Sequence, residues 1–200
     1  MMGQRDRYVR QNCEVTPSDG NASYPGVKSI IPYNNLAKPV GKPLAAEGQL
    51  LYLYGRVFDK NCVPLKDAVV DIWQTDPYGE RVKPSGSELA LPDPIFAGSG
   101  RAYTNDNGEF FFMTLYPAPS GSKRAPKIHA YVTHPEMKTL KTSLYFAGDR
   151  RNDEDSHYKR LFEPQRKRVS IEVMPRSDKD GALQGQIDLI MDGNSAFRQF

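Results

Sequence analysis

The chain has 200 residues, and its 27 lysines and arginines against 24 acidic residues give a formal net charge of +3. Charges of both signs alternate along the chain, which does not indicate nucleic-acid binding. Because there is no run of roughly 18 apolar residues and no apolar centre of a signal peptide near the start, we expect a cytoplasmic protein that does not bind membranes.

Residues 1–47 are polar and contain the successive turn signals TPSDG, YPG, IPYNN and KPVGKP. Such a density of Gly, Pro, Asn and Asp predicts an irregular amino-terminal arm that wraps around the rest of the chain. The arm holds Cys13, and the other cysteine is Cys62. Since there is no CxxC spacing and cytoplasmic proteins seldom keep disulfides, we expect two free thiols.

Residues 48–200 contain short runs rich in β-branched and aromatic residues, separated by turn residues. The runs are QLLYLYGRVF, AVVDIWQ, EFFFMTL, KIHAYV, LKTSLYF, RVSIEVM and QIDLIMD. Asn-Gly in TNDNGEF predicts a hairpin, and SDKDGALQG is expected to join the last two strands. The pattern predicts a single all-β domain, a β-sandwich of seven to eight strands.

Several polar and aromatic residues have structural interpretations. We expect Trp73 to lie in the core, because large aromatic side chains dominate sandwich cores. The run NDEDSHYKRLF has an acidic beginning and a basic end, which favours one helical turn. We expect the overlapping run DRRNDEDSHYKR to be a solvated surface, with His134 and His157 exposed rather than acting as ligands.

The densest motif is YGRVFDKNCVPLKDAVVDIWQTDPYGERV, followed by LPDPIFAGSGRAYTNDNGEFFFMTLYPAP and SLYFAGD. In residue type and spacing these segments resemble the intradiol ring-cleavage dioxygenases, and the segment IPYNNLAKPVGKPLAAEGQ resembles the protocatechuate branch in particular. The resemblance covers roughly residues 30–150, and it implies the transthyretin-like β-sandwich of that family. The tail IDLIMDGNSAFRQF is also similar to the tail of protocatechuate-type subunits.

The resemblance also implies a ferric ion held by two tyrosinates and two histidines, with a catechol-type substrate bound to the metal. At the four ligand positions this sequence has Arg81, Ser120, Lys127 and His129, so one ligand type remains. Arg124 stands at the position of an arginine that the family uses beside the substrate. Lys127 and His129 are two residues apart, so on a strand they share one face.

A protonated lysine has no lone pair to offer a metal, and its charge repels a cation. We therefore expect no cofactor, unless Tyr78 or Tyr103 supplies a replacement ligand and Fe(III) is bound after all. The sequence has no G-x-S-x-G elbow, no phosphate loop and no H-E-x-x-H motif, which argues against the corresponding hydrolase, nucleotide-binding and zinc-protease classes.

Four functions remain open. The leading one is a non-catalytic, degenerate intradiol-family chain, or pseudoenzyme, that pairs with a homologous iron-bearing subunit or forms a homo-oligomer. The second is an active dioxygenase with rearranged ligands. The third is a cationic pocket that binds a small aromatic acid through Arg81, Lys123, Arg124, Lys127 and His129. The fourth is a transthyretin-like interaction module, since a fold alone does not give a function.

Overall fold

The structure is a computed structural model that describes residues 13–38, 41, 45–82, 95–178 and 181–193. Its strands are β1 (Leu50–Asp59), β2 (Val69–Gln74), β3 (Ser99–Tyr103), β4 (Glu109–Leu115), β5 (Lys127–Thr133), β6 (Leu140–Phe146), β7 (Ser170–Pro175) and β8 (Leu183–Met191). The helical segments are η1 (Val27–Ser29), η2 (Arg150–Glu154), η3 (Tyr158–Arg160) and α1 (Glu163–Arg168). None of these is long and apolar enough to cross a membrane.

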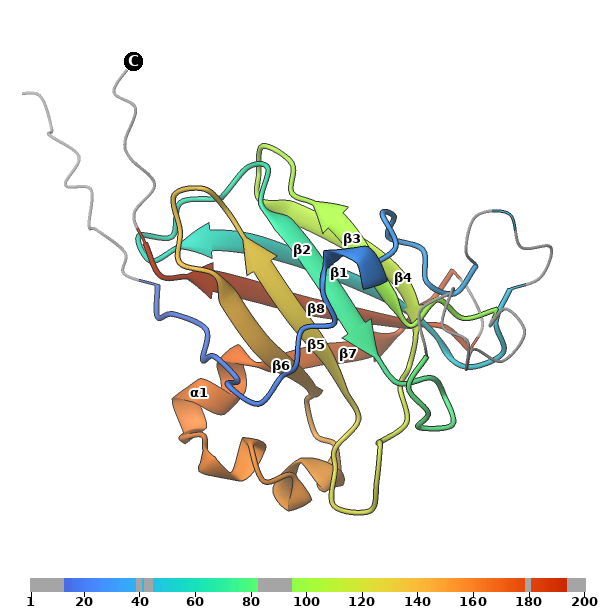
Figure 1. Cartoon of the computed structure of the whole chain (residues 1–200). Helices are drawn as coiled ribbons and strands as arrows, with labels where there is room; N and C mark the ends of the chain where they lie inside the picture. The colour runs from blue at the N-terminus through green and yellow to red at the C-terminus, as the bar shows by residue number, and fades with distance from the viewer. Residues whose placement is uncertain (1–12, 39–40, 42–44, 83–94, 179–180, 194–200) are drawn as a thin grey trace, which may run out of the picture.

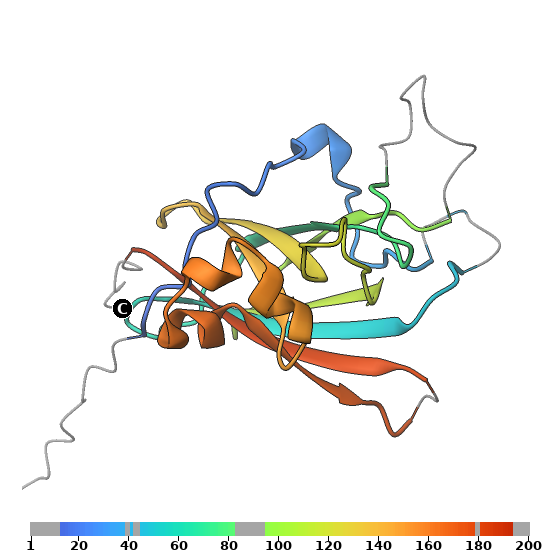
Figure 2. The ribbon, with the colours of Figure 1, turned by 90° about the horizontal axis from the view of Figure 1, so that it is seen from below.

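The strands form two packed layers (Figures 1 and 2). The order β3-β2-β5-β6 makes one layer and β7-β8-β1-β4 the other, and a short parallel pairing of β6 with β7 joins them. Along β1 and β5 buried and less buried residues alternate, as expected where one strand face meets the core. The predicted all-β sandwich is confirmed.

The strand β3 is absent from the runs that the sequence pattern selects, because its residues SGRAY are mostly small or polar. Its position also corrects the predicted hairpin at TNDNGEF. β3 pairs with β2 whereas β4 pairs with β1, so the turn connects the two layers and does not form a two-stranded ladder. Gly108 has a φ of 72°, so the glycine itself was correctly placed at a left-handed position. The last two strands, β7 and β8, are antiparallel neighbours as predicted.

The segment after β6 differs from the expectation in two ways. Instead of one helical turn it contains η2, η3 and α1, of which α1 begins only at Glu163. It is also not a solvated surface throughout, because the side chains of Asn152 and Asp155 are 4% and 0% exposed. Asn152 donates to the carbonyl oxygen of Phe146, which fixes the segment against the end of β6. These helical segments cover one end of the sandwich (Figure 1).

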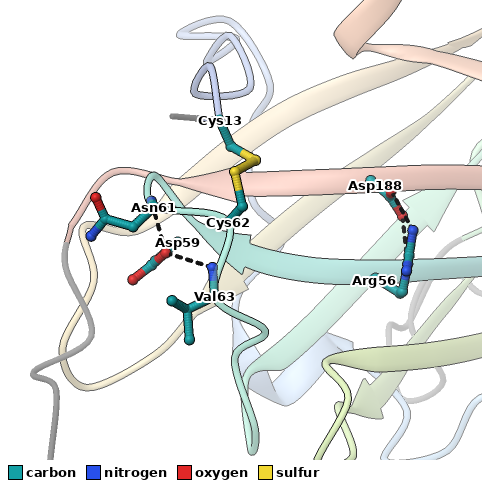
Figure 3. The surroundings of a disulfide bond; sticks show 7 residues. All are labelled: Cys13, Arg56, Asp59, Asn61, Cys62, Val63 and Asp188. Carbon is teal, nitrogen blue, oxygen red and sulfur yellow. Dashed lines mark hydrogen bonds and ion pairs between the residues drawn. A yellow bond between two sulfur atoms is a disulfide. The ribbon is translucent and has the colours of Figure 1, made fainter. Parts of the chain in front are cut away.

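The expectation of two free thiols is wrong, because Cys13 and Cys62 form a disulfide. Their Cα atoms are 5.3 Å apart although the residues are separated by 49 positions. The amide of Cys13 donates to the carbonyl oxygen of Lys60, so the arm runs beside the turn between β1 and β2 (Figure 3). Cysteine spacing could not show this, because the pairing depends on where the arm lies on the sandwich.

Candidate functional site

Lys127 and His129 lie on β5 with their side chains on the same face of the layer. His129 is opposite Trp73 of β2 and Ser143 of β6, and Lys127 is opposite Tyr145. Side chains from the arm and from the segment after β6 come to the same place. Together they form a group that we call the polar cluster, defined as Asp19, Lys127, His129, Ser143, Tyr145, Asp155 and His157.

Lys127 is held by a buried carboxylate. Its Nζ lies 2.7 Å from Oδ2 of Asp155, and the two side chains are 11% and 0% exposed. Asp155 also accepts from the backbone amides of Ala125 and His157 and from the hydroxyl of Tyr145. Burial alone would raise the pKa of Asp155, but the hydrogen bond and charge of Lys127, with the backbone amides, lower it to about 2. The cluster therefore contains a charged ion pair whose carboxylate accepts several further hydrogen bonds.

Tyr145 contacts both Lys127 and Asp155. Its side chain is fully buried, and burial together with the negative charge of Asp155 keeps the pKa of its hydroxyl far above the ordinary value. The phenol thus stays protonated and donates to Asp155. The ammonium of Lys127 also lies 5.3 Å from the centroid of the Tyr145 ring, within the range of a cation–π contact.

His129 is in a different state from Lys127. Its Nδ1 is 2.8 Å from Oγ of Ser143, and that hydroxyl is 2.5 Å from Oδ2 of Asp19. Since a carboxylate only accepts, Ser143 donates to Asp19 and accepts from Nδ1–H, which leaves the lone pair of His129 on Nε2. Burial, then the charges of Lys127 and Arg81, lower the pKa of His129 to about 4, so the ring is neutral at pH 7.

Asp19 brings the arm into the cluster. Burial would raise the pKa of Asp19, but the hydrogen bond from Ser143, the amide of Asn21 and the two nearby histidines lower it. Its Oδ1 is 3.3 Å from Nδ1 of His157, whose Nε2 is buried with no hydrogen-bond partner among the described residues. His157 is therefore part of the cluster, and the expectation that it would be exposed is wrong.

Trp73 does not lie in the core between the layers, as the sequence suggested. It is half-buried on the outer face of β2, where its ring stacks on His129 at a centroid distance of 5.3 Å. Tyr24 of the arm packs edge-on against Trp73, stacks on Tyr131 and donates to Asp71. The tryptophan is thus partly covered by the arm, which local sequence patterns cannot reveal.

Arg81 and Arg124 are close enough to the cluster for their charges to affect it, and Ser120 lies on a loop next to that of Arg81. The charge of Arg81 acts on His129, and the charge of Arg124 acts on Tyr145. All three side chains are exposed. The loop that carries Ser120 lies against the loop that carries Arg81, since the amide of Ala118 donates to the carbonyl oxygen of Asp76 at 3.0 Å. Neither arginine forms an ion pair with any residue in the described ranges.

The two tyrosines proposed as replacement ligands are both largely exposed. Tyr78 is 77% exposed, in the turn that follows β2. Tyr103 is 61% exposed and lies opposite Val69, whereas Ser99 is the β3 residue that lies opposite Trp73 in the His129 row. The separation between Ser99 and Tyr103 along β3 is about 13 Å at the usual rise of a strand. Tyr103 instead lines an open groove of about 1320 Å³ that runs over β1, β4 and β8.

These donors do not match a ferric site. In the part of the chain that the structure describes, no three His, Cys, Asp or Glu side chains gather as metal ligands. Of the four positions, one holds an arginine, one a serine and one an ion-paired lysine, which leaves Nε2 of His129 as a nitrogen ligand. A ferric centre with tyrosinate and histidine ligands therefore does not fit the residues present.

Comparison with known proteins gives the family. The family described as Dioxygenase matches residues 34–159. The beta chain of protocatechuate 3,4-dioxygenase from Burkholderia cepacia is 29% identical over 164 residues, covering 78% of this chain and 68% of that protein. This chain belongs to the intradiol ring-cleavage dioxygenase family. Another family relative, a Rickettsia conorii protein whose dioxygenase name is provisional, is 31% identical over 182 residues, covering 86% of this chain and 83% of that protein.

Comparison of this fold with solved structures also supports the intradiol family. The dioxygenase domain of a dioxygenase–carbohydrate-binding fusion from Streptomyces sp. SirexAA-E is 27% identical, with a TM-score of 0.68. The match covers 90% of this chain and 100% of that domain. The family normally depends on Fe(III), so the contrast with the residues at Arg81, Ser120 and Lys127 bears directly on what this member does.

Proposed function

We propose that this chain is a non-catalytic member of the intradiol dioxygenase family. The observation that carries the proposal is the buried ion pair between Lys127 and Asp155, at 2.7 Å, where the family places a metal-binding histidine. An ammonium can bind a metal only after it loses its proton, and here that proton is shared with an ionised carboxylate. At this position the chain therefore has a buried ion pair in place of a metal ligand.

In this proposal the chain contributes structure to an assembly. One relative is named as the beta chain of protocatechuate 3,4-dioxygenase, so members of this family include chains of multi-chain enzymes. We propose that this chain associates with a homologous iron-bearing subunit or with copies of itself. Any ferric chemistry would then belong to the partner, and this chain would supply part of the surface around it.

The first test is the iron content of the purified chain, measured together with its visible spectrum. We expect well under one iron per chain, no tyrosinate-to-iron charge-transfer colour, and no oxygen uptake when catechol or protocatechuate is added. Stoichiometric iron with colour would contradict the proposal and support the active dioxygenase with rearranged ligands. The colour matters because iron bound nonspecifically at the surface lacks tyrosinate ligands.

A specific observation favours a second candidate function, the binding of a small aromatic acid. Arg81 and Arg124 lie beside the cluster, exposed and without an ion-pair partner among the described residues, and a guanidinium matches a carboxylate in geometry. Lys127 contributes little to such binding because Asp155 already neutralises its charge. The neutral ring of His129, whose pKa the charge of Arg81 helps to lower, stacks on Trp73 and provides a less polar group near that arginine.

For this second candidate we expect protocatechuate to bind the native chain in a calorimetric titration. Replacing both Arg81 and Arg124 by glutamine is expected to weaken binding at least about 10-fold, since a charge-assisted hydrogen bond contributes about 1.5–3 kcal/mol. Arg56→Gln is the control, because it removes an exposed arginine of β1, in the other layer and outside the cationic pocket. Equal affinities of the native chain and the double variant would exclude the arginines as the binding groups.

A further inference from the structure

The arm crosses from one layer of the sandwich to the other. We call its residues 13–24 the strap; Figure 2 shows it, in blue, on the outer side of the layer that contains β2, β5 and β6. The amide of Thr16 donates to the carbonyl oxygen of Ile190 in β8 at 3.0 Å, and the amide of Asp19 donates to the carbonyl oxygen of Lys141 in β6 at 2.8 Å. The strap therefore follows a defined path, although it contains no regular secondary structure.

The strap completes the polar cluster. It carries Asp19, which accepts from Ser143 and contacts His157, and Tyr24, which covers Trp73. Ser143 in turn sets the tautomer of His129. Without the strap, His129 loses the carboxylate that orients its hydrogen-bond partner, and Trp73 loses an aromatic neighbour.

The strap is attached covalently at its first residue. Cys13 is bonded to Cys62, which lies in the turn after β1 (Figure 3). That turn is well supported, because the buried carboxylate of Asp59 accepts from the amides of Asn61 and Val63. The turn that carries Cys62 therefore has hydrogen bonds that do not depend on the disulfide.

We propose that the Cys13–Cys62 disulfide is a redox-cleavable tether that keeps Asp19 and Tyr24 on the polar cluster. A dithiol reductant breaks the S–S bond by supplying two electrons and two protons, so that Cys13 and Cys62 become thiols and the reductant becomes a disulfide. Both cysteines are only half-buried, so a reductant can reach them. The strap then depends on a few hydrogen bonds and ring contacts, and the net contribution of a typical hydrogen bond to stability is modest.

The tether gives the cluster two states. In the oxidised chain Asp19, Ser143 and His129 are connected; in the reduced chain the strap exchanges with solvent-exposed conformations. Disulfides in reducing compartments are usually transient or redox-sensing. A chain that functions in such a compartment would have its cluster assembled only under oxidising conditions. The proposal concerns this assembly and does not depend on whether the chain binds iron, so the iron measurement and the test below can fail independently.

The test is hydrogen exchange followed by mass spectrometry on the full chain, before and after reduction with dithiothreitol under native conditions. Alkylation of two thiols confirms the reduction, and circular dichroism confirms that the sandwich persists. We expect exchange in residues 14–24 to become at least about 10-fold faster, while β2, β5 and β6 stay protected. The Cys13→Ser, Cys62→Ser double variant is expected to exchange like the reduced chain and to show no response to dithiothreitol.

A second variant, Asp19→Asn, separates the tether from the carboxylate. It keeps the disulfide, so slow exchange in the strap is expected to persist in oxidised Asp19→Asn and to be lost on reduction. Unchanged exchange in the strap of the reduced native chain would overturn the proposal, because noncovalent contacts alone would then hold it. Loss of protection throughout the sandwich would overturn it as well, since the disulfide would then stabilise the whole fold rather than the strap.

Discussion

Replacing Asp155 by asparagine is expected to lower the free energy of unfolding by about 3–5 kcal/mol, as found when one partner of a buried ion pair is removed. The reason is that Lys127, which is 11% exposed, would keep its charge without a counterion. The amide of asparagine also cannot replace a carboxylate that accepts from Ala125, Tyr145 and His157 together. Urea unfolding, followed by tryptophan fluorescence and circular dichroism, measures the difference.

The matched control is Asp153→Asn, which makes the same chemical change on an exposed residue of the same segment. It is expected to change stability by no more than about 0.5 kcal/mol. If Asp155→Asn and Asp153→Asn have equal effects, the ion pair with Lys127 contributes nothing to stability. Our account of the cluster would then be wrong.

The pH dependence provides an independent check of the same group. The pKa of Asp155 is lowered to about 2 in the folded chain, so the unfolded chain takes up this proton first as the pH falls. Its contribution, about 2–3 kcal/mol from the size of the shift, is present above about pH 4 and is lost between about pH 4 and pH 2. The stability difference between the native chain and Asp155→Asn should therefore shrink in that window.

Restoring the family ligands is expected to create an iron site in this chain. The triple variant Arg81→Tyr, Ser120→Tyr, Lys127→His would present two phenols and two imidazoles, with His129 unchanged. Asp155 would then be able to accept a ring N–H of the new histidine, as carboxylates commonly do behind histidine ligands. We expect about one Fe(III) per chain and a tyrosinate charge-transfer colour in this variant, and neither in the native chain.

The control for this variant is the triple change Arg81→Phe, Ser120→Phe, Lys127→His, which has similar ring volumes but no phenolate oxygen. It is expected to fold similarly and to show no charge-transfer colour. Circular dichroism of both variants establishes that the sandwich is intact. A folded tyrosine variant that stays colourless and iron-free would show that the site has changed beyond its ligand positions, for example through the strap and Asp19.

The sequence alone was sufficient for the architecture in most places. Runs such as EFFFMTL and KIHAYV are strands because β-branched and aromatic residues favour a pleated, half-buried surface. The strand β3 was missed because SGRAY lacks that composition and is held by pairing with β2. The turn before β4 was assigned to a hairpin because a turn residue predicts backbone geometry, whereas the partner of a strand is decided by the packing of the layers.

The candidate site, like the fold, could be predicted from the sequence only in part. The resemblance to the family implies that Arg81, Ser120, Lys127 and His129 stand at its ligand positions, which stays a prediction. Alternation along a strand predicts that Lys127 and His129 share a face, and both lie on β5. Asp155 was hidden in a run that reads as solvated surface, and no local signal marks it as the partner of Lys127. Acidic runs such as DED are too common on protein surfaces to identify one of their residues as buried.

The sequence by itself determined the family and the β-sandwich, because these follow from residue types at short, ordered spacings. That three of the family's metal-ligand positions are replaced is what the resemblance implies, and it stays a prediction. Only the tertiary structure decided that Lys127 is neutralised by Asp155, 28 positions away, and that Ser143 bonds to Asp19, 124 positions away. The Cys13–Cys62 disulfide belongs with them. Such contacts depend on how the arm and the segment after β6 pack on the sandwich, and the free energy of that packing is spread over many distant residues.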